Sequence, residues 1–383
     1  MSQLNDHSSR AHALLSASSS ARWLKCPPSA VAATMYESAD TEFTREGTLA
    51  HEVAEIVVRR RLPQLYPDID TLEYPEGYTR EMIQCAEAYA DYIQELITDG
   101  NAVVLLEQRL DLSPWVPRGF GTGDCIIIQG NRLDVVDYKY GQGVPVSAEK
   151  NSQMRLYALG ALHDFGDIYD IDEVVMHIFQ PRLNNVSSER LSVAELLAWG
   201  EEIKPVAQLA AAGRGDMAAG DHCRFCPHAG SCPTLAASCT KVVNLHEGKA
   251  AIPSLAPWMV ADILKAEPML SAWLKAVKDR ALSCLLNGEE IPGYKVVEGR
   301  SSRAWSDEAA VLERLQNCHY SPEEYLKTEL LSPAQLEKSI GKKIAADLVS
   351  DLIVSKPGAP TVAPESDKRK PFDRLAEARK DFE

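Results

Sequence analysis

Residues 121–140 read GTGDCIIIQGNRLDVVDYKY and predict two β-strands joined by a tight turn. The strands are expected at Asp124–Gln129 and Leu133–Tyr140, because both are short apolar runs and the intervening Gly130-Asn131 is a strong hairpin signal. A third strand-like run, Ala102–Leu112, comes just before them. The sequence therefore predicts a β-sheet built around this hairpin.

Helical patterns flank these strands. Apolar residues recur at helical spacing in residues 44–61 and 79–98, and again in Ser152–Leu162 after the hairpin. A further strand-like run, Glu173–Phe179, follows. The order helix, three strands, helix, strand indicates a mixed α/β core.

The chain has 383 residues and is too long for one ordinary small domain. We expect a core domain over residues 1–245 and a mostly helical accessory domain over residues 246–356, with a short strand-like piece at Gly293–Val297. Residues 357–383 begin Pro-rich and become charged, and we expect an extended charged tail there.

The net charge of −15 argues against a protein that coats nucleic acid nonspecifically, since such binding depends on Lys and Arg neutralising phosphates. It leaves room for an enzyme that engages DNA in one local cleft. No run of about 18 apolar residues is present, so no membrane span is expected. Met1–Ser20 is polar and lacks the apolar region of a secretory signal, which points to the cytoplasm.

Two carboxylates and a lysine are expected to converge at one end of the hairpin. Alternate residues of a strand share a face, so Asp137 and Lys139 point the same way. Asp124 begins the partner strand, just after Gly121-Thr122-Gly123, where small residues allow backbone and ligand to approach closely. Taken alone this pattern also fits a surface hairpin with an Asp–Lys ion pair.

The same residues suit metal-assisted phosphodiester hydrolysis. Mg²⁺ and Mn²⁺ prefer hard oxygen ligands, which Asp124 and Asp137 can supply. Such an ion polarises a phosphodiester and lowers the pKa of a water. Lys139 can position that water or offset developing charge, and His51 on the preceding predicted helix can add a nitrogen ligand.

Four short motifs occur in a fixed order: EGTLAH (46–51), GTGD (121–124), VVDYK (135–139) and QMRLY (153–157). Together they resemble the PD-(D/E)XK nuclease superfamily in its RecB-like branch, which includes the AddB and CRISPR-associated exonucleases. The resemblance implies a restriction-endonuclease-like mixed sheet flanked by helices, with residues 1–245 as the nuclease domain.

The resemblance also implies roles for the acidic and helical residues. His51 matches the metal-ligand histidine, and Asp124 matches the first acidic ligand. Asp137 and Lys139 match the (D/E)-x-K pair, and the main-chain carbonyl of Tyr138 would be a further metal ligand. The first acidic motif is Gly-Thr-Gly-Asp rather than Pro-Asp, a departure usual in this branch.

Gln153 and Tyr157 match a Q-x3-Y helix motif that contacts DNA near the scissile phosphate, and a spacing of four puts them on one helix face. Glu107, on the strand before Asp124, could approach the metal from the side. A solvated or structural glutamate fits position 107 equally well.

Three cysteines, Cys223-x2-Cys226-x5-Cys232, have tight spacing for one metal site. Zinc is one candidate, with His222 and His228 nearby as ligands. Soft thiolates also suit an iron–sulfur cluster, for which a [4Fe–4S] centre needs four.

Cys239 and Cys26 are the candidates for the fourth thiolate. The AddB and CRISPR-associated nucleases are similar in pattern, with one Cys before the core and C-x2-C-x5-C-P after it. This resemblance implies a [4Fe–4S] cluster on Cys26, Cys223, Cys226 and Cys232, clasping both ends of the core, with zinc as the alternative. The other cysteines, Cys85, Cys125, Cys284 and Cys318, are expected to be small core residues.

Over residues 12–375 the chain also resembles a phage- and prophage-encoded family of uncharacterised proteins, through HALLSASSSARWLKCP (12–27), IPGYKVVEGRSSRAW (291–305) and PESDKRKP (364–371). We therefore expect a Mg²⁺- or Mn²⁺-dependent DNA exonuclease of phage recombination or DNA processing, with a single-strand annealing or binding protein as its natural partner. The alternatives are a structure-specific endonuclease and a catalytically silent, metal-stapled DNA-binding or assembly protein.

Overall fold

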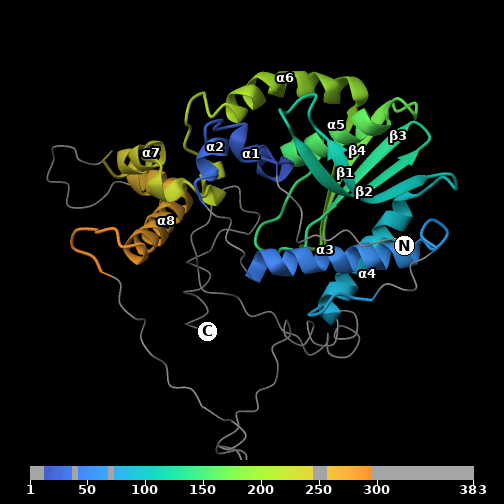
Figure 1. Ribbon diagram of the computed structural model, residues 1–383, viewed down its shortest axis with the longest axis horizontal. Coiled ribbons are helices and arrows are strands. Elements are labelled where there is room, and N and C mark those ends of the chain that lie inside the picture. Colours follow the sequence, from blue (N-terminus) through green and yellow to red (C-terminus); the bar gives the residue numbers. More distant parts are fainter. Residues whose placement is uncertain (1–12, 37–41, 68–72, 245–256, 296–383) are drawn as a thin grey trace, which may run out of the picture. The chain divides into compact units, whose positions relative to one another are not determined.

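The computed structural model describes residues 13–36, 42–67, 73–244 and 257–295 (Figure 1). The chain divides into two compact units, Met1–Arg303 and Ala304–Glu383, and every described residue lies in the first. The predicted tail and most of the predicted accessory domain, including Cys318, lie outside the described residues.

A five-stranded sheet forms the centre of the described unit, and its strands lie in sequence order. The strands are β1 (Val103–Asp111), β2 (Phe120–Gln129), β3 (Arg132–Tyr138), β4 (Glu173–Gln180) and β5 (Asn185–Ser192). Only β3 and β4 pair in parallel within this sheet; the other neighbours are antiparallel. A parallel pair needs a crossover, which helix α5 (Ser152–Phe165) supplies.

Helices cover both faces of the sheet. Helices α3 (Glu42–Arg61) and α4 (Arg80–Leu96) lie on one side, and α5 and α6 (Val193–Ala211) lie on the other (Figure 1). The alternation along β3 explains the two layers, because Leu133 and Val135 pack toward α5 while Val136 and Tyr138 pack toward α3 and α4.

Helix starts follow local capping chemistry. The Asn151 side chain accepts hydrogen bonds from the main-chain N–H groups of Gln153 and Met154, which fixes the first turn of α5. Ser192 and Glu195 form a reciprocal capping box at the start of α6.

Short helices at the two ends of the described unit lie near each other. The N-terminal ones are η2 (Ala17–Ser19), α1 (Ser20–Trp23) and α2 (Ser29–Ala33), and Trp23 is fully buried against the α5 side of the core. The later ones are η5 (Asp221–Phe225), η6 (Ala229–Ser231) and α7 (Pro233–Asn244), which pack against the long helix α8 (Pro257–Leu286). The remaining short helix, η4 (Pro181–Leu183), lies between β4 and β5.

The predicted α/β core is confirmed, with small differences in its elements. Strand β2 begins four residues before the predicted start, and β3 ends at Tyr138 rather than Tyr140. Strand β5 and helix α6 were not predicted. Gly293, Tyr294 and Lys295 do not form the start of a strand, and residues 296–297 lie outside the described part.

The single cysteines Cys85, Cys125 and Cys284 are buried, as predicted for core residues. Among the described residues, no helix combines the length and apolarity needed to cross a membrane.

Candidate functional site

Three carboxylates lie in register across three neighbouring strands. The pairs Leu106–Cys125 and Gln108–Gly123 flank position 107 of β1, so Glu107 faces Asp124 of β2. The β2–β3 ladder ends at Cys125–Val136, so the next residues along, Asp124 and Asp137, are neighbours too. Asp124 therefore stands between the other two carboxylates.

The backbone of β1 is distorted at this point. Glu107 has a φ of 51°, a left-handed conformation that costs a residue with a side chain about 1–2 kcal/mol. Val103, Leu105 and Leu110 all pack on the α5 side of the sheet. In a regular strand Leu110, five residues after Leu105, would lie on the opposite face. The turn at Glu107 therefore shifts the alternation of the strand and directs this carboxylate toward Asp124.

A histidine from the helical layer joins two of these carboxylates. His51 on α3 places its Nδ1 3.4 Å from Asp124 Oδ1. His51, Glu107 and Asp124 each offer one ligand atom, and the three atoms lie within 4.8 Å of one another. In the described ranges this is the one group of His, Cys, Asp and Glu side chains gathered so closely. Asp137, a predicted ligand, is not a member of it.

Asp137 is instead connected to the lysine and the glutamine. Lys139 Nζ lies 2.9 Å from Asp137 Oδ2, and Gln153 Nε2 donates to Asp137 Oδ1 at 3.2 Å. Lys139 also donates to Gln153 Oε1 at 3.4 Å. Gln153 Nε2 further contacts the Tyr157 hydroxyl at 3.3 Å, so both α5 residues face the carboxylates. The predicted common face of Asp137 and Lys139 is present.

The two aspartates have opposite pKa shifts. Burial alone would raise the pKa of Asp124, but the charge and hydrogen bond of His51, helped by Lys139, lower it overall. Burial raises the pKa of Asp137, and the Lys139 charge only partly opposes this rise. Burial would lower the pKa of His51, yet Asp124 and then Glu107 raise it to about 9. This group of side chains therefore favours bound positive charge.

The structure thus brings together His51, Asp124, Asp137, Lys139, Gln153 and Tyr157 as predicted neighbours. The main-chain N–H of Tyr138 donates to Asp124 Oδ2 at 2.8 Å, which orients that carboxylate. Its carbonyl as a metal ligand stays a prediction. The sequence could not decide whether Glu107 belongs to the site, because its position depends on a distortion of the backbone. Its one indication in the sequence was a single glutamate within an apolar strand.

The cysteine loop lies beside the N-terminal helices. Cys223, Cys226 and Cys232 pack in one small cluster with Leu235 of α7. Burial raises the pKa of Cys223, and the neighbouring sulfurs of Cys226, Cys232 and Cys26 add to the rise. Cys26 is therefore a close neighbour of the loop despite its distance in sequence.

Cys239 behaves differently from Cys26. It is fully buried in the same apolar cluster, and burial alone raises its pKa, with no contribution from a neighbouring sulfur. The N-terminal segment is also joined to the loop by a hydrogen bond of 3.0 Å between the Tyr36 hydroxyl and His228 Nδ1. Cys239 thus packs with the three cysteines of the loop, and Cys26 lies near enough for its sulfur to act on the pKa of Cys223 and Cys226.

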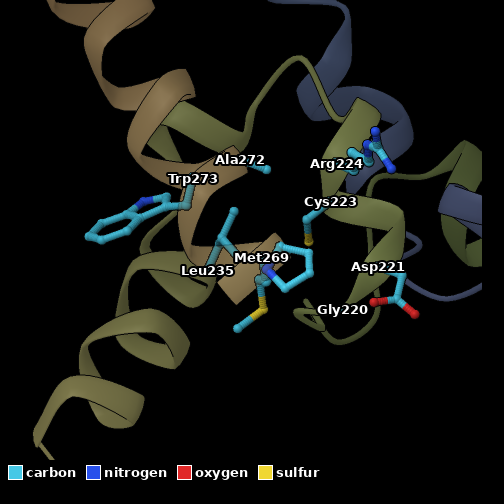
Figure 2. A pocket seen from close by; sticks show the side chains of 9 residues that line it. Gly220, Asp221, Cys223, Arg224, Leu235, Met269, Ala272 and Trp273 are labelled. Atoms are coloured by element: carbon cyan, nitrogen blue, oxygen red, sulfur yellow. The ribbon is translucent and has the colours of Figure 1, made fainter. Parts of the chain in front are cut away.

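Helix α8 closes the cysteine loop from the other side. Figure 2 shows a pocket lined by Met269 and Trp273 of α8 together with Leu235 and Cys223. Gly230 packs so closely on α8 that a Cβ there would collide with the main-chain oxygen of Ala276. The loop is thus held between the N-terminal segment and α8.

Comparisons with known proteins place the chain in a family without assigning an activity. A solved structure titled "Crystal structure of SSO0001" matches 48% of this chain and 85% of its own, at 16% identity and a TM-score of 0.24, an overlap that fixes neither fold nor function. The family model for a protein of unknown function, DUF2800, matches residues 12–370. Because that match spans nearly the whole chain, the protein belongs to the DUF2800 family.

Proposed function

We propose that this chain is a metal-dependent DNA nuclease, and that it acts as an exonuclease. One observation carries the proposal: the His51–Glu107–Asp124 group lies directly beside the Asp137–Lys139–Gln153 network. The first is a set of ligands for a cation, and the second supplies a fixed ammonium and a fixed amide. Phosphodiester hydrolysis needs both a cation and positioned donors.

The donor atoms fit Mg²⁺ or Mn²⁺. One imidazole nitrogen and two carboxylates form a hard ligand set without thiolates. Asp137 is almost fully buried, and its Oδ2 contacts the Lys139 ammonium at 2.9 Å. A carboxylate oxygen has two lone pairs and can accept from a second partner. This oxygen is available to a second positive partner, so Asp137 can complete the ligand set proposed from the sequence.

The chemistry that a bound ion supplies is polarisation of the phosphodiester and of the attacking water. The protein groups around it hold the remaining parts in place. Lys139 is anchored by Asp137 and Gln153, so its ammonium can offset negative charge at the phosphorus centre. The Tyr157 hydroxyl is held by Gln153 and limits where the scissile strand can lie.

We propose a [4Fe–4S] cluster on Cys26, Cys223, Cys226 and Cys232. These four cysteines are neighbours, and four cysteine thiolates are the usual ligands of a [4Fe–4S] cluster. A tetrahedral zinc with Zn–S bonds of about 2.3 Å would hold its sulfur ligands about 3.8 Å from one another. Among the described residues, no three thiols of this loop lie mutually that close. His222 Nε2 lies 2.9 Å from Ala218 O and His228 Nδ1 lies 3.0 Å from the Tyr36 hydroxyl, which leaves one nitrogen of each ring for zinc, the alternative metal.

The proposed role of the cluster is structural. Cys26 lies between α1 and α2, before the sheet, whereas the other three cysteines follow α6. A cluster on these four residues would join the start and the end of the nuclease core. In phage recombination or DNA processing, a single-strand annealing or binding protein is the proposed partner.

The test uses anaerobically purified full-length protein with linear and covalently closed DNA, in Mg²⁺ or Mn²⁺. We expect degradation of linear DNA alone; cleavage of closed circles would instead identify an endonuclease. Asp124→Asn and Asp137→Ala should abolish cleavage, whereas Glu201→Gln, on the exposed side of α6, should leave it unchanged. Equal activity of wild type and Asp137→Ala would refute the nuclease proposal and favour a silent DNA-binding protein.

The cluster has its own readout. Iron per chain and broad visible absorption of the anaerobic protein are expected for [4Fe–4S]. A colourless protein that contains stoichiometric zinc after the same handling would replace the cluster with a zinc site, and would leave the nuclease proposal intact.

A further inference from the structure

Arg182 connects four separate segments of the protein near the metal group. It lies in η4, just after β4, and its side chain is only 8% exposed. Because β3 and β4 are parallel, with Tyr138 opposite Phe179, Arg182 emerges at the same end of the sheet as Asp137 and Lys139.

Two of its partners are carboxylates on the helical layer. Arg182 Nη1 donates to Glu46 Oε1 of α3 at 3.2 Å. Arg182 Nε lies 3.3 Å from Glu81 Oε1 in the first turn of α4. One guanidinium thus joins both helices of this layer to the end of β4.

Its other two partners, Tyr140 and Gln142, lie in the segment that follows Lys139. The guanidinium carbon lies 4.4 Å above the centre of the Tyr140 ring. With the Gln142 amide oriented to satisfy both groups, its oxygen accepts from Arg182 Nη2 at 2.8 Å and from Nε at 2.7 Å. Arg182 therefore contacts both the segment that follows Lys139 and helix α3.

The position of His51 depends on α3 being held in one place along its axis. Buried residues of α3 such as Ala50 and Val53 fix its distance from the sheet, but apolar packing is non-directional. Glu46 lies five residues before His51, about 7.5 Å along the axis at about 1.5 Å per residue. A directional hydrogen bond there sets the axial position of the helix.

We propose that Arg182 is a positioning residue of the metal site, which holds the helix of His51 in register with the strand end that carries Asp137 and Lys139. This inference rests on the proposed function. Arg182 does not touch the ligand atoms; it acts through Glu46 and through the segment after Lys139. Lysine cannot replace it, because a single ammonium cannot reproduce a planar group with donors in several directions.

The test compares Arg182→Lys with Arg132→Lys, a matched control at the opposite end of the sheet. Arg132 also joins the sheet to the helical layer: its side chain contacts Asp134 of β3 at 2.7 Å and the main-chain oxygen of Leu96 in α4 at 3.3 Å. Both variants keep the charge and lose several hydrogen bonds. Thermal unfolding of the apo form and calorimetric titration with Mn²⁺ are measured on the cluster-loaded full chain, well below the unfolding midpoint.

Both variants should unfold at lower temperature, but only Arg182→Lys should lose Mn²⁺ affinity. The expected loss is about 10- to 100-fold, as for residues that orient metal ligands from outside. Unchanged Mn²⁺ affinity of Arg182→Lys, or an equal loss in Arg132→Lys, would overturn the proposal. If Arg182→Lys does not fold, Glu46→Ala removes the α3 link alone and should still weaken Mn²⁺ binding.

The wild type separates this inference from the proposed function. Wild-type protein that neither binds Mn²⁺ nor cleaves DNA contradicts the nuclease proposal itself. Wild-type protein that does both, beside an Arg182→Lys variant with the same Mn²⁺ affinity, contradicts only the role of Arg182.

Discussion

The ring of Tyr157 lies against the main chain of Gly121, so closely that a Cβ at position 121 would stand 2.6 Å from the ring carbon Cε1. Real side chains do not approach to that distance, so glycine is required by the ring. Tyr157 in turn contacts Gln153, which donates to Asp137. The first glycine of the Gly-Thr-Gly-Asp motif therefore supports the α5 side of the site.

We expect Gly121→Ala to lower kcat by a larger factor than it lowers Mn²⁺ affinity. The new methyl group would displace the Tyr157 ring and with it the amide that holds Asp137 and Lys139, whereas His51 and Asp124 are held from the other side by α3. Overpacking costs about 1–3 kcal/mol, so the midpoint of thermal unfolding should also fall.

Gly100→Ala is the control for this variant. Position 100 has open space where the Cβ would be placed, and it lies in the turn after α4. Its kcat and unfolding midpoint should match the wild type. Normal turnover in Gly121→Ala would show that the Tyr157 ring can move without affecting the reaction.

Glu107 gives a prediction in which stability and metal binding separate. Glu107→Ala and Glu107→Gly both remove a proposed ligand, so both should weaken Mn²⁺ binding by about tenfold or more in calorimetric titrations. The backbone here has a φ of 51°, which glycine adopts freely. Glu107→Gly should therefore be more stable than Glu107→Ala by about 1 kcal/mol in denaturant unfolding. Wild-type Mn²⁺ affinity in both would remove Glu107 from the site.

Position 107 also marks the limit of what the sequence could predict. Asp124, Asp137 and Lys139 were predictable because a hairpin with period-two alternation fixes which residues meet. Gln153 and Tyr157 were predicted from the resemblance of QMRLY to the Q-x3-Y motif, and helical spacing accounts for their common face. The left-handed turn at Glu107 reflects the fit of two strands and a helix, and no local residue preference encodes it.

Strand β5 was missed for a related physical reason. Its residues NVSSERLS alternate between half-buried and exposed, so an edge strand of this kind carries almost no apolar signal. Helix α6 follows a capping box that the sequence does contain, Ser192 with Glu195, and could have been found from it. The contacts of Arg182 could not, because its partners come from α3, α4 and the segment after β3.

The fourth thiol of the cysteine site can be identified by two matched substitutions. We expect Cys26→Ser to lose most bound iron and the visible absorption of the anaerobic protein, because Cys26 neighbours the sulfurs of Cys223 and Cys226. Cys239→Ser should keep both, since Cys239 is an apolar packing residue. The reverse pattern of iron content would assign the ligand to Cys239.

Helix α8 should control how firmly the cysteine site holds its metal. Gly230→Ala would force the loop and α8 apart, because the added methyl group collides with the main-chain oxygen of Ala276, which cannot rotate away. We expect a loss of about 1–3 kcal/mol in unfolding free energy and faster release of bound metal to a chelator under anaerobic conditions.

Gly100→Ala again provides the comparison, since its Cβ meets no neighbour. Nuclease turnover by Gly230→Ala, measured before metal is released, should equal that of the wild type, because His51, Asp124 and Lys139 lie on other elements. Unchanged chelator kinetics in Gly230→Ala would mean that α8 does not protect the loop. A simultaneous loss of turnover and bound metal, from the first time point, would instead show that the cysteine site supports the catalytic carboxylates directly.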